Sequence, residues 1–302
     1  MPIVELNGVR KVYDTKVAVD NISLRIQPGT MFGLLGPNGS GKTSTIRMMI
    51  GITIPDAGTV QLFGEPFKRE NLQRVGYLPE ERGLYKKMNV LEQLTFMGQL
   101  HGLTEGESKK RAHQWCEKLQ ITEALPKKTE ELSKGMQQKI QFIASLMHNP
   151  ELVIMDEPFS GLDPVNATLL QDVLIELRNA GRAVLFSTHR MDQVEKMCDE
   201  IALVHQGHLV LSGSMREVKS KYPRNRVHIA YEGDSSFLQH PSIAEAKNFS
   251  GYSDIILRDD ACDAQPLLQS AIAHGTRIWR FEVVEPTLED IFITTVGGNV
   301  DA

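Results

Sequence analysis

The chain has 302 residues, of which 41% are hydrophobic and 24% charged, and its formal net charge is −5. This composition is ordinary for a globular protein with one large core or with a larger and a smaller domain, and the acidic balance argues against a nucleic-acid-binding surface. Three widely spaced cysteines, Cys116, Cys198 and Cys262, argue against a disulfide framework or a zinc site and fit a reducing cytosol.

The N-terminus lacks the apolar region of a secretory signal, and no segment approaches the roughly 18–20 apolar residues of a membrane helix. If this protein works at a membrane, we expect another chain to provide the membrane-spanning part.

The first two hundred residues alternate short apolar strands with helical patterns. Three segments separated by turns predict an antiparallel β layer, namely 3–6, 22–26 and 59–64. Three almost continuously apolar runs predict strands buried on both faces of a parallel sheet, namely 31–35, 152–156 and 183–187. Between roughly 87 and 148 the pattern becomes helical, which predicts a helical insertion into an α/β core.

A second, smaller domain is predicted after this core. Residues 201–213 indicate a hairpin that turns at Gln206-Gly207, and a helix follows over 214–222. The segment YPRNR then interrupts the pattern, so we place the domain boundary between 222 and 223. Residues 223–302 predict a small α+β domain with the order β, β, α, β, α.

The segment GPNGSGKT (36–43) matches the pattern G-x-x-x-x-G-K-[ST] between a buried strand and a helix, which is the context that a phosphate-binding loop requires. Its glycines let successive backbone N–H groups face an anion, and the helix N-terminus adds partial positive charge. Lys42 is expected to bridge the β- and γ-phosphates, and the Thr43 hydroxyl to bind Mg²⁺. The predicted ATP-binding set is Gly36, Pro37, Asn38, Gly39, Ser40, Gly41, Lys42, Thr43 and Ser44.

Two further strands end in residues suited to phosphate chemistry. LVIMD (152–156) places Asp156 at the carboxyl edge of the sheet, where it can hold Mg²⁺, and Glu157 follows as a candidate to polarise the attacking water. The alternative for Glu157 is a surface carboxylate after a strand. His189, after another buried strand, is a candidate γ-phosphate sensor and holder of Glu157. Lys42, Glu157 and His189 are the predicted catalytic residues.

With these motifs in order, residues 1 to about 220 resemble the ATPase subunit of an ABC transporter. GPNGSGKT resembles its Walker A loop, LSKGMQQ (132–138) its LSGGQ signature, LVIMDE its Walker B strand, and STH (187–189) its switch histidine. Tyr13 lies where this family stacks an aromatic ring on adenine; the alternative is a core tyrosine. The resemblance implies a P-loop NTPase fold with a mixed sheet, an antiparallel β layer and a helical subdomain at about 87–148. It matches the family's D-loop to Ser160, Gly161, Leu162 and Asp163.

In this family two subunits pair head to tail, and the signature of one caps the ATP held by the other. The resemblance therefore implies that Ser133, Lys134 and Gly135 serve a nucleotide on a second copy, most simply in a homodimer with two sites. The signature departs from LSGGQ by Lys134, which could add positive charge near the phosphate, and by Met136. Ser133 and Gly135 are kept, so we expect function to survive.

A larger departure lies in VGYLPEERGLYKKM (75–88), where Glu80 replaces the family's usual glutamine. A carboxylate can still bind Mg²⁺, but it adds negative charge and donates no hydrogen bond. Our hypothesis is that Glu80 keeps the metal contact, with Thr43 and Asp156, and the coupling role.

YLPEERGLY and PTLEDIFI (286–293) resemble the NatA-like branch, whose members pair with separate type-2 permeases and carry a small C-terminal domain. This implies an ATP- and Mg²⁺-dependent exporter motor, cytoplasmic and peripheral on the inner face of the cell membrane. The permease would dock on the helical insertion and on the segment containing Arg82, Leu84 and Tyr85. The C-terminal domain would stabilise the dimer, contact the permease or be a passive appendage.

The main alternative is a soluble ABC ATPase that acts on ribosomes or DNA. Proteins of that class carry two cassettes in tandem or a long coiled-coil insertion, often with basic arms. This chain has one motif set, no long heptad pattern and a negative charge, so no nucleic-acid partner is expected. A kinase or GTPase would not need LSKGM, and the guanine motif NKxD is absent from the sequence.

Overall fold

The computed structural model describes residues 1–81, 83–258 and 263–297. The chain forms two compact units, Met1–Met215 and Arg216–Ala302, whereas the sequence analysis placed the boundary at 222/223. None of the helices in the described part of the chain is both long and apolar enough to cross a membrane.

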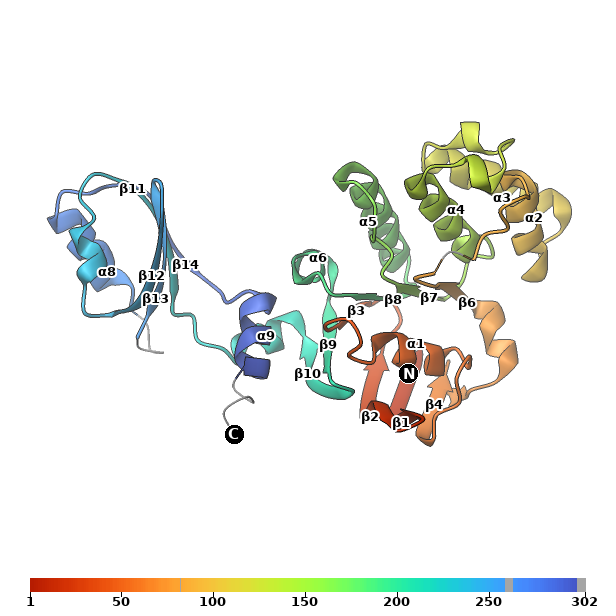
Figure 1. The fold of residues 1–302 in the computed structure, drawn as a ribbon, viewed down its shortest axis with the longest axis horizontal. Helices are drawn as coiled ribbons and strands as arrows, with labels where there is room; N and C mark the ends of the chain where they lie inside the picture. Colours follow the sequence, from red (N-terminus) through yellow and green to blue (C-terminus); the bar gives the residue numbers. More distant parts are fainter. Residues whose placement is uncertain (82, 259–262, 298–302) are drawn as a thin grey trace. The chain divides into compact units, whose positions relative to one another are not determined.

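A six-stranded sheet forms the centre of the first unit, with the strand order β10-β9-β3-β8-β7-β6 (Figure 1). The three continuous apolar runs are its neighbouring strands β3 (Met31–Leu35), β8 (Ala183–Thr188) and β7 (Leu152–Asp156). Every residue in them is buried, as expected for strands covered on both faces. They pair in parallel, which confirms the prediction and brings their carboxyl ends to one edge.

The remaining strands of this sheet lie on its two sides. β6 (Val75–Leu78) pairs in parallel with β7. On the other side, β9 (Glu200–His205) pairs in parallel with β3 and forms an antiparallel hairpin with β10 (His208–Ser214). The hairpin turns at the predicted Gln206-Gly207, whose φ angles of 48° and 84° are the left-handed values that such tight turns need.

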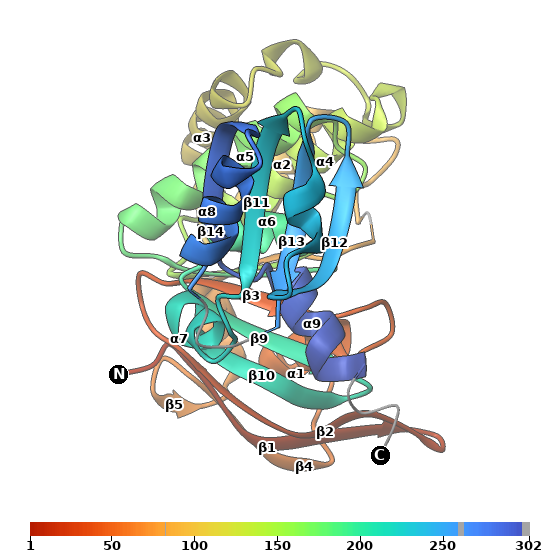
Figure 2. The same cartoon turned by 90° about the vertical axis from the view of Figure 1, so that its left-hand side faces the viewer.

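The predicted antiparallel layer is present as a four-stranded sheet whose strands are seen side by side in Figure 2. It contains β2 (Lys16–Ile26), β1 (Val4–Tyr13), β4 (Ala57–Leu62) and β5 (Glu65–Pro66), in that order. Its apolar side chains share one core cluster with the central sheet and with α1 (Lys42–Met49). Helix α1 is therefore held by apolar contacts with its N-terminus at the sheet edge.

Helices surround this core. The predicted helical region contains α2 (Val90–Leu100), α3 (Glu105–Lys118) and α4 (Lys134–Leu146), each begun by a side-chain cap from Asn89, Thr104 or Ser133. The other helical elements of the described first unit are η1 (Arg69–Arg74), η2 (Thr122–Ala124), η3 (Thr129–Glu131), α5 (Pro164–Asn179) and α6 (Met191–Met197).

The second unit is a four-stranded antiparallel sheet with the order β12-β13-β11-β14. A small apolar core beneath it includes Ile229, Phe237 and Leu267. The strand β12 is absent from the sequence prediction because its polar residues, among them Glu245 and Lys247, give no apolar alternation. The elements are α7 (Met215–Ser220), which spans the unit boundary, β11 (Arg226–Glu232), η4 (Ser236–Gln239), β12 (Ile243–Phe249), β13 (Tyr252–Leu257), α8 (Gln265–Ala273), β14 (Arg277–Val284) and α9 (Leu288–Gly297).

Two histidines connect the helical region to β6. The rings of His101, after α2, and His148, after α4, stack with centroids 3.7 Å apart. The Nε2 atom of His148 lies 3.0 Å from the Val75 carbonyl oxygen, which can only accept, so this nitrogen carries the proton. Burial, with the charges of His101 and Arg111, lowers the pKa of His148 to about 4.

We predict that acid destabilises the first unit through His148. The unfolded chain, with a histidine pKa of about 6.5, binds more protons than the folded chain, so stability falls as the pH drops from about 6.5 towards 4. Between pH 7 and pH 5 the melting temperature should fall by about 5 °C. His148→Gln, which keeps a donor for Val75, should reduce this fall, whereas the exposed-site control His113→Gln should not. An unchanged pH dependence in His148→Gln would contradict the assignment.

Candidate functional site

The loop at residues 36–41 connects β3 to α1, and close backbone contacts fix its shape. Gly36 and Gly41 have φ angles of 146° and 113°. A Cβ atom on Gly36 would lie 2.1 Å from the Val204 carbonyl oxygen, and a Cβ atom on Gly41 would lie 2.4 Å from the Ala18 carbonyl oxygen. The Gly207 N–H donates to the Ser40 carbonyl at 2.8 Å, which ties the loop to the β9–β10 turn. The curled loop predicted from the glycines is therefore present, and only glycine fits at these two positions.

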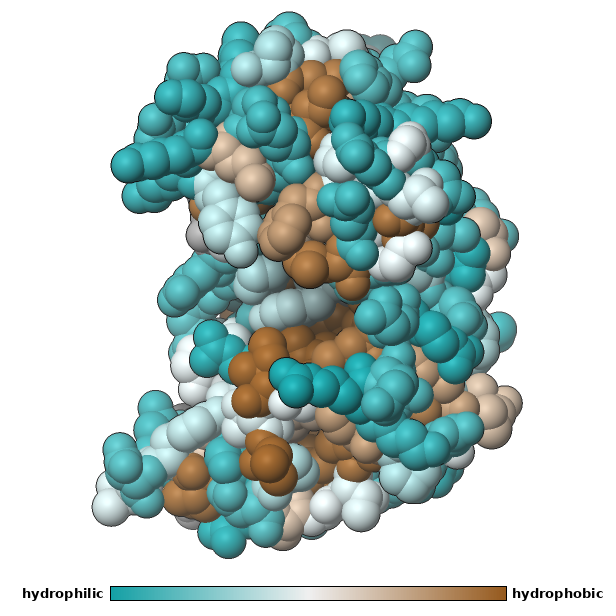
Figure 3. All heavy atoms as spheres, turned by 90° about the vertical axis from the view of Figure 1, so that its right-hand side faces the viewer, coloured by the Kyte–Doolittle hydropathy of each residue, from teal (hydrophilic) through white to brown (hydrophobic). Residues whose placement is uncertain are grey.

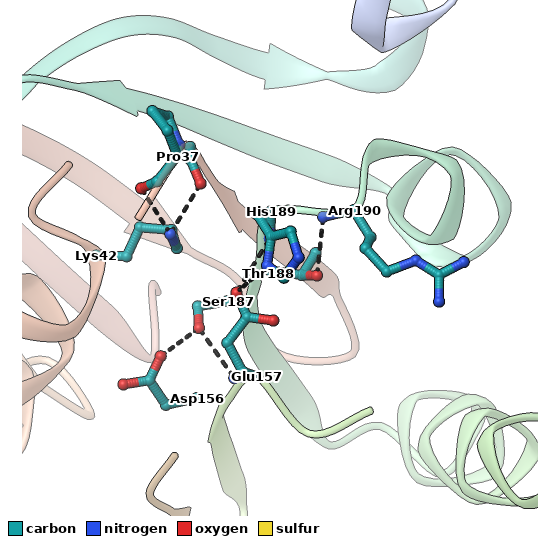
Figure 4. Close-up of polar contacts among 9 residues, drawn as sticks. Pro37, Lys42, Asp156, Glu157, Ser187, Thr188, His189 and Arg190 are labelled. Carbon is teal, nitrogen blue, oxygen red and sulfur yellow. Dashed lines mark hydrogen bonds and ion pairs between the residues drawn. The ribbon is translucent and has the colours of Figure 1, made fainter. Parts of the chain in front are cut away.

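Lys42 lies inside this loop and is only 6% exposed. Its ammonium donates to the carbonyl oxygens of Gly36 at 2.8 Å and Pro37 at 3.0 Å (Figure 4). Burial lowers the pKa of Lys42, while the carboxylates of Glu157, Asp156 and Glu80 act in the opposite direction. The loop therefore holds a nearly enclosed cation that faces three carboxylates.

Asp156 ends β7 and is 1% exposed. Its Oδ1 accepts a short hydrogen bond from Ser187 of the neighbouring strand β8. Its Oδ2 is buried and has no hydrogen-bond partner among the described residues. A carboxylate with one bonded and one unbonded oxygen suits a hard divalent cation such as Mg²⁺, and Thr43 lines the same cavity.

Glu157 is held at both its backbone and its side chain. Its backbone has a φ of 50°, and its N–H lies 3.2 Å from the carbonyl oxygen and 3.1 Å from the Oγ of Ser187. Its Oε1 accepts from the His189 N–H at 3.1 Å and lies 2.9 Å from His189 Nδ1. Figure 4 shows the two side chains directed toward each other. The contact leaves Nε2 of the half-exposed His189 available for another partner.

The loop, the start of α1, the end of β7 and two more distant segments enclose one cavity of about 470 Å³. It brings together all three predicted metal-binding residues, two of the three predicted catalytic residues, six of the nine predicted ATP-binding residues between 36 and 44, and Tyr13, which is 41% exposed. His189 reaches the cavity through its contact with Glu157. The lining residues are Tyr13, Lys16, Ala18, Asn38, Gly39, Gly41, Lys42, Thr43, Ser44, Glu80, Asp156 and Glu157.

Three residues that the sequence analysis did not select belong to this site. Lys16 and Ala18 line the cavity from the start of β2, and Lys16 was visible only as a cation shortly after Tyr13. Ser187 bonds both Asp156 and the Glu157 N–H. Its signal was a polar residue near the end of an otherwise apolar strand.

The signature and D-loop residues lie outside the cavity that their own chain forms. Ser133 begins α4, where its Oγ accepts from the Met136 N–H at 3.3 Å. Asp163 begins α5, where its Oδ1 accepts from the Asn166 N–H at 3.0 Å. The two segments are neighbours, since the Cβ position of Gly135 lies 3.7 Å from a methyl group of Leu162. Ser133 and Lys134 are exposed, as are Ser160, Gly161 and Asp163.

A second cavity, of about 360 Å³, lies between the helical region and β6. Figure 3 shows hydrophobic side chains gathered in a hollow on this side of the molecule. Leu84 lines the cavity, and Tyr85 is 54% exposed with its ring against Phe96. Arg82, which the sequence analysis grouped with them, lies outside the described residues. We call this cavity the apolar groove; it is lined by Ile50, Ile52, Leu72, Val75, Tyr77, Pro79, Gly83, Leu84, Met97, His101, Gln141, Ala144, Ser145 and His148.

Comparison with known proteins agrees with this arrangement. The family model described as ABC transporter matches residues 19–160, and the model for the C-terminal domain of DrrA1-3-like ATP-binding proteins matches 213–296. The ABC transporter ATP-binding protein YhaQ of Bacillus subtilis is 42% identical over 97% of this chain and 98% of its own. The Nod factor export ATP-binding protein I of Cupriavidus metallidurans is 36% identical over 72% of each chain.

A solved ATP-binding subunit of an ABC transporter is 27% identical to this chain and superposes with a TM-score of 0.68. The superposition covers 72% of this chain and 92% of the solved one. The chain therefore belongs to the ATP-binding subunits of ABC transporters, in the branch with a DrrA-like C-terminal domain, and is an ATP-hydrolysing enzyme.

Proposed function

We propose that this chain is the ATP-hydrolysing motor of an exporter and drives a separate membrane permease. The observation that carries the proposal is the convergence of the phosphate-loop residues, Asp156 and the Glu157–His189 pair on one cavity. Export is supported by the name of the Nod factor export relative. The permease, rather than this chain, would select the cargo.

ATP binding uses the loop and the first strands. The phosphates take the place of the two carbonyl partners of Lys42, and the backbone N–H groups from Asn38 to Ser44 surround them. The exposed Tyr13 ring at the cavity stacks on adenine. Lys16, the additional cation lining the cavity, compensates further phosphate charge.

Hydrolysis needs a metal ion, a water molecule and a group that polarises it. Thr43, Asp156 and Glu80 would hold Mg²⁺, which would neutralise charge on the phosphates. Glu157 accepts a proton or hydrogen bond from the attacking water, and His189 fixes the Glu157 carboxylate. With its Nδ1 directed at Glu157, His189 offers Nε2 to the γ-phosphate.

The signature acts on a second copy of the chain. Because Ser133 and Gly135 lie outside their own cavity at a helix N-terminus, where Ser133 is exposed and Gly135 is partly exposed, they complete the site of a partner in a head-to-tail homodimer. Lys134 adds positive charge at that interface, and the D-loop residues 160–163 lie beside it. Two ATP molecules are thus enclosed between the two chains and join them.

The apolar groove receives the permease. It opens beside Glu80, because Pro79 lines the groove and an adjoining cavity contains Glu80, Glu81 and Asp156. A segment that docks there can sense the nucleotide site through the residues around Glu80. We therefore propose that the chain acts in the cytoplasm, bound peripherally to the inner face of the cell membrane.

Glu157→Gln should lower the ATP turnover number by about a hundredfold or more, because the amide keeps the size of the carboxylate but cannot act as a base. The variant should also accumulate as an ATP-bound dimer, measured by size-exclusion chromatography with light scattering. Asp172→Asn, an exposed change on α5, should leave both quantities unchanged. Wild-type turnover in Glu157→Gln would remove Glu157 from the proposed mechanism.

Glu80→Ala should raise the Mg²⁺ concentration for half-maximal ATPase activity by about tenfold, since it removes one oxygen ligand. Glu80→Gln should restore most of the metal contact, and the neighbouring change Glu81→Ala serves as the control. If Glu80→Ala left MgATP affinity, turnover and partner-stimulated activity unchanged, Glu80 would have neither the metal role nor the coupling role.

The proposed function as a whole is tested by affinity capture. Tagged Glu157→Gln chain, which stabilises the dimer, should recover a polytopic membrane protein from gently solubilised cells. Recovery of ribosomes or nucleic acid without a membrane protein would instead support a soluble ATPase of the ribosome- or DNA-associated class. Wild-type chain without ATP provides the background.

A further inference from the structure

Helix α4 buries three long polar residues side by side, which is unusual for the core face of an amphipathic helix. Gln138, Lys139 and Gln141 are between 5% and 6% exposed. Each donates a hydrogen bond to a backbone carbonyl group elsewhere in the chain. Since carbonyl oxygens only accept, the amide nitrogens of both glutamines must face them. The destinations of these bonds reveal what the helix supports.

Gln138 supports the segment that carries Glu157. Its Nε2 donates to the carbonyl oxygen of Pro158, the next residue, at 3.1 Å. Together with the bonds from the Glu157 N–H to Ser187, this fixes the backbone on both sides of Glu157. The left-handed backbone at Glu157 needs such support, because this conformation is unfavourable for a residue with a side chain.

Gln141 supports the segment that carries Glu80. Its Nε2 donates to the carbonyl oxygens of Pro79 at 3.3 Å and Glu81 at 3.1 Å, one on each side of Glu80. The helix is also fixed to β6, because the Cβ position of Gly76 lies only 2.2 Å from the Ser145 carbonyl oxygen. Helix α4 and the strand leading to Glu80 therefore pack as one body.

We propose that Gln138 and Gln141 are positioning residues, through which α4 aligns Glu157 and Glu80 with the signature segment at its own N-terminus. This inference rests on the proposed function and deepens it. When Ser133 and Gly135 engage the nucleotide of the partner chain, the helix they begin is the one that holds both carboxylate-bearing segments of their own chain. Capture of one nucleotide thereby sets the geometry for hydrolysis of the other.

The test uses Gln138→Met, which keeps the length of the side chain and removes the donor. Lys139→Met is the matched control, since Lys139 is equally buried on the same helix but donates to Leu119, at the end of α3. Gln138→Met should lower the turnover number about fivefold to tenfold with the KM for ATP within about twofold of wild type. Lys139→Met should change neither value by more than about twofold.

Mixed dimers then locate the effect. Two mixed dimers are prepared, and two different tags, one on each chain, are used to purify them. In each dimer, one of the two chains carries Glu157→Gln, so that one of the two sites is inactive. When Gln138→Met is placed in the chain with intact Glu157, turnover should fall about fivefold to tenfold. In the second dimer Gln138→Met is placed in the Glu157→Gln chain. That chain contributes only its signature to the remaining active site, so turnover should equal that of the dimer without Gln138→Met.

Equal or reversed losses in the two dimers would overturn the inference while leaving the proposed function intact, because Gln138 would then act through folding or through the signature. Failure of Glu157→Gln to inactivate a site would overturn both. If Gln138→Met does not fold, as judged by its melting temperature, Gln138→Leu is the substitute variant, because it also removes the donor and buries no charge. Gln141→Met extends the test, because it should raise the Mg²⁺ requirement in the way that Glu80→Ala does, and an unchanged requirement would remove Gln141 from the inference.

Discussion

The chemistry of this protein depends on one constraint, that three neighbouring parallel strands end at the same edge of a buried sheet. β3 delivers the phosphate loop, β7 delivers Asp156 and Glu157, and β8 delivers Ser187 and His189. These segments are far apart in the sequence and meet only because the strands pair in parallel. The apolar burial of the strands is thus also what fixes the distances within the site.

Residue patterns were sufficient for much of this arrangement. Continuous apolar strands identified the sheet, and the glycine loop and the Asp156-Glu157 pair marked its functional edge. Residues that contribute through a single contact were harder to find. Ser187 is one polar residue in an apolar strand, and Lys16 is one cation among many, so their roles depend on which segments fold beside them. The strand β12 escaped prediction because an edge strand with one solvent-exposed face tolerates charged residues.

In helix α4, buried polar groups specify the packing partner more narrowly than apolar groups would. An apolar helix face would pack against many similar surfaces, whereas Gln138 and Gln141 lose hydrogen bonds unless particular carbonyl groups lie opposite them. The same helix presents its N-terminus to solvent at Ser133 and lines the apolar groove at Gln141, Ala144 and Ser145. One helix therefore takes part in three contacts: its buried glutamines hold segments of its own chain, its N-terminus faces the proposed partner chain, and its groove side faces the proposed permease.

The backbone of Glu157 has a further consequence. A non-glycine residue with a φ of 50° stores conformational energy of about 1 kcal/mol or more. A glycine there would relieve that strain and would also remove the carboxylate that His189 holds. Selection for thermal robustness alone therefore favours losing this side chain, and selection for turnover favours keeping it. Position 157 is a point at which durability and activity compete, and variants recovered for higher melting temperature should be checked there first.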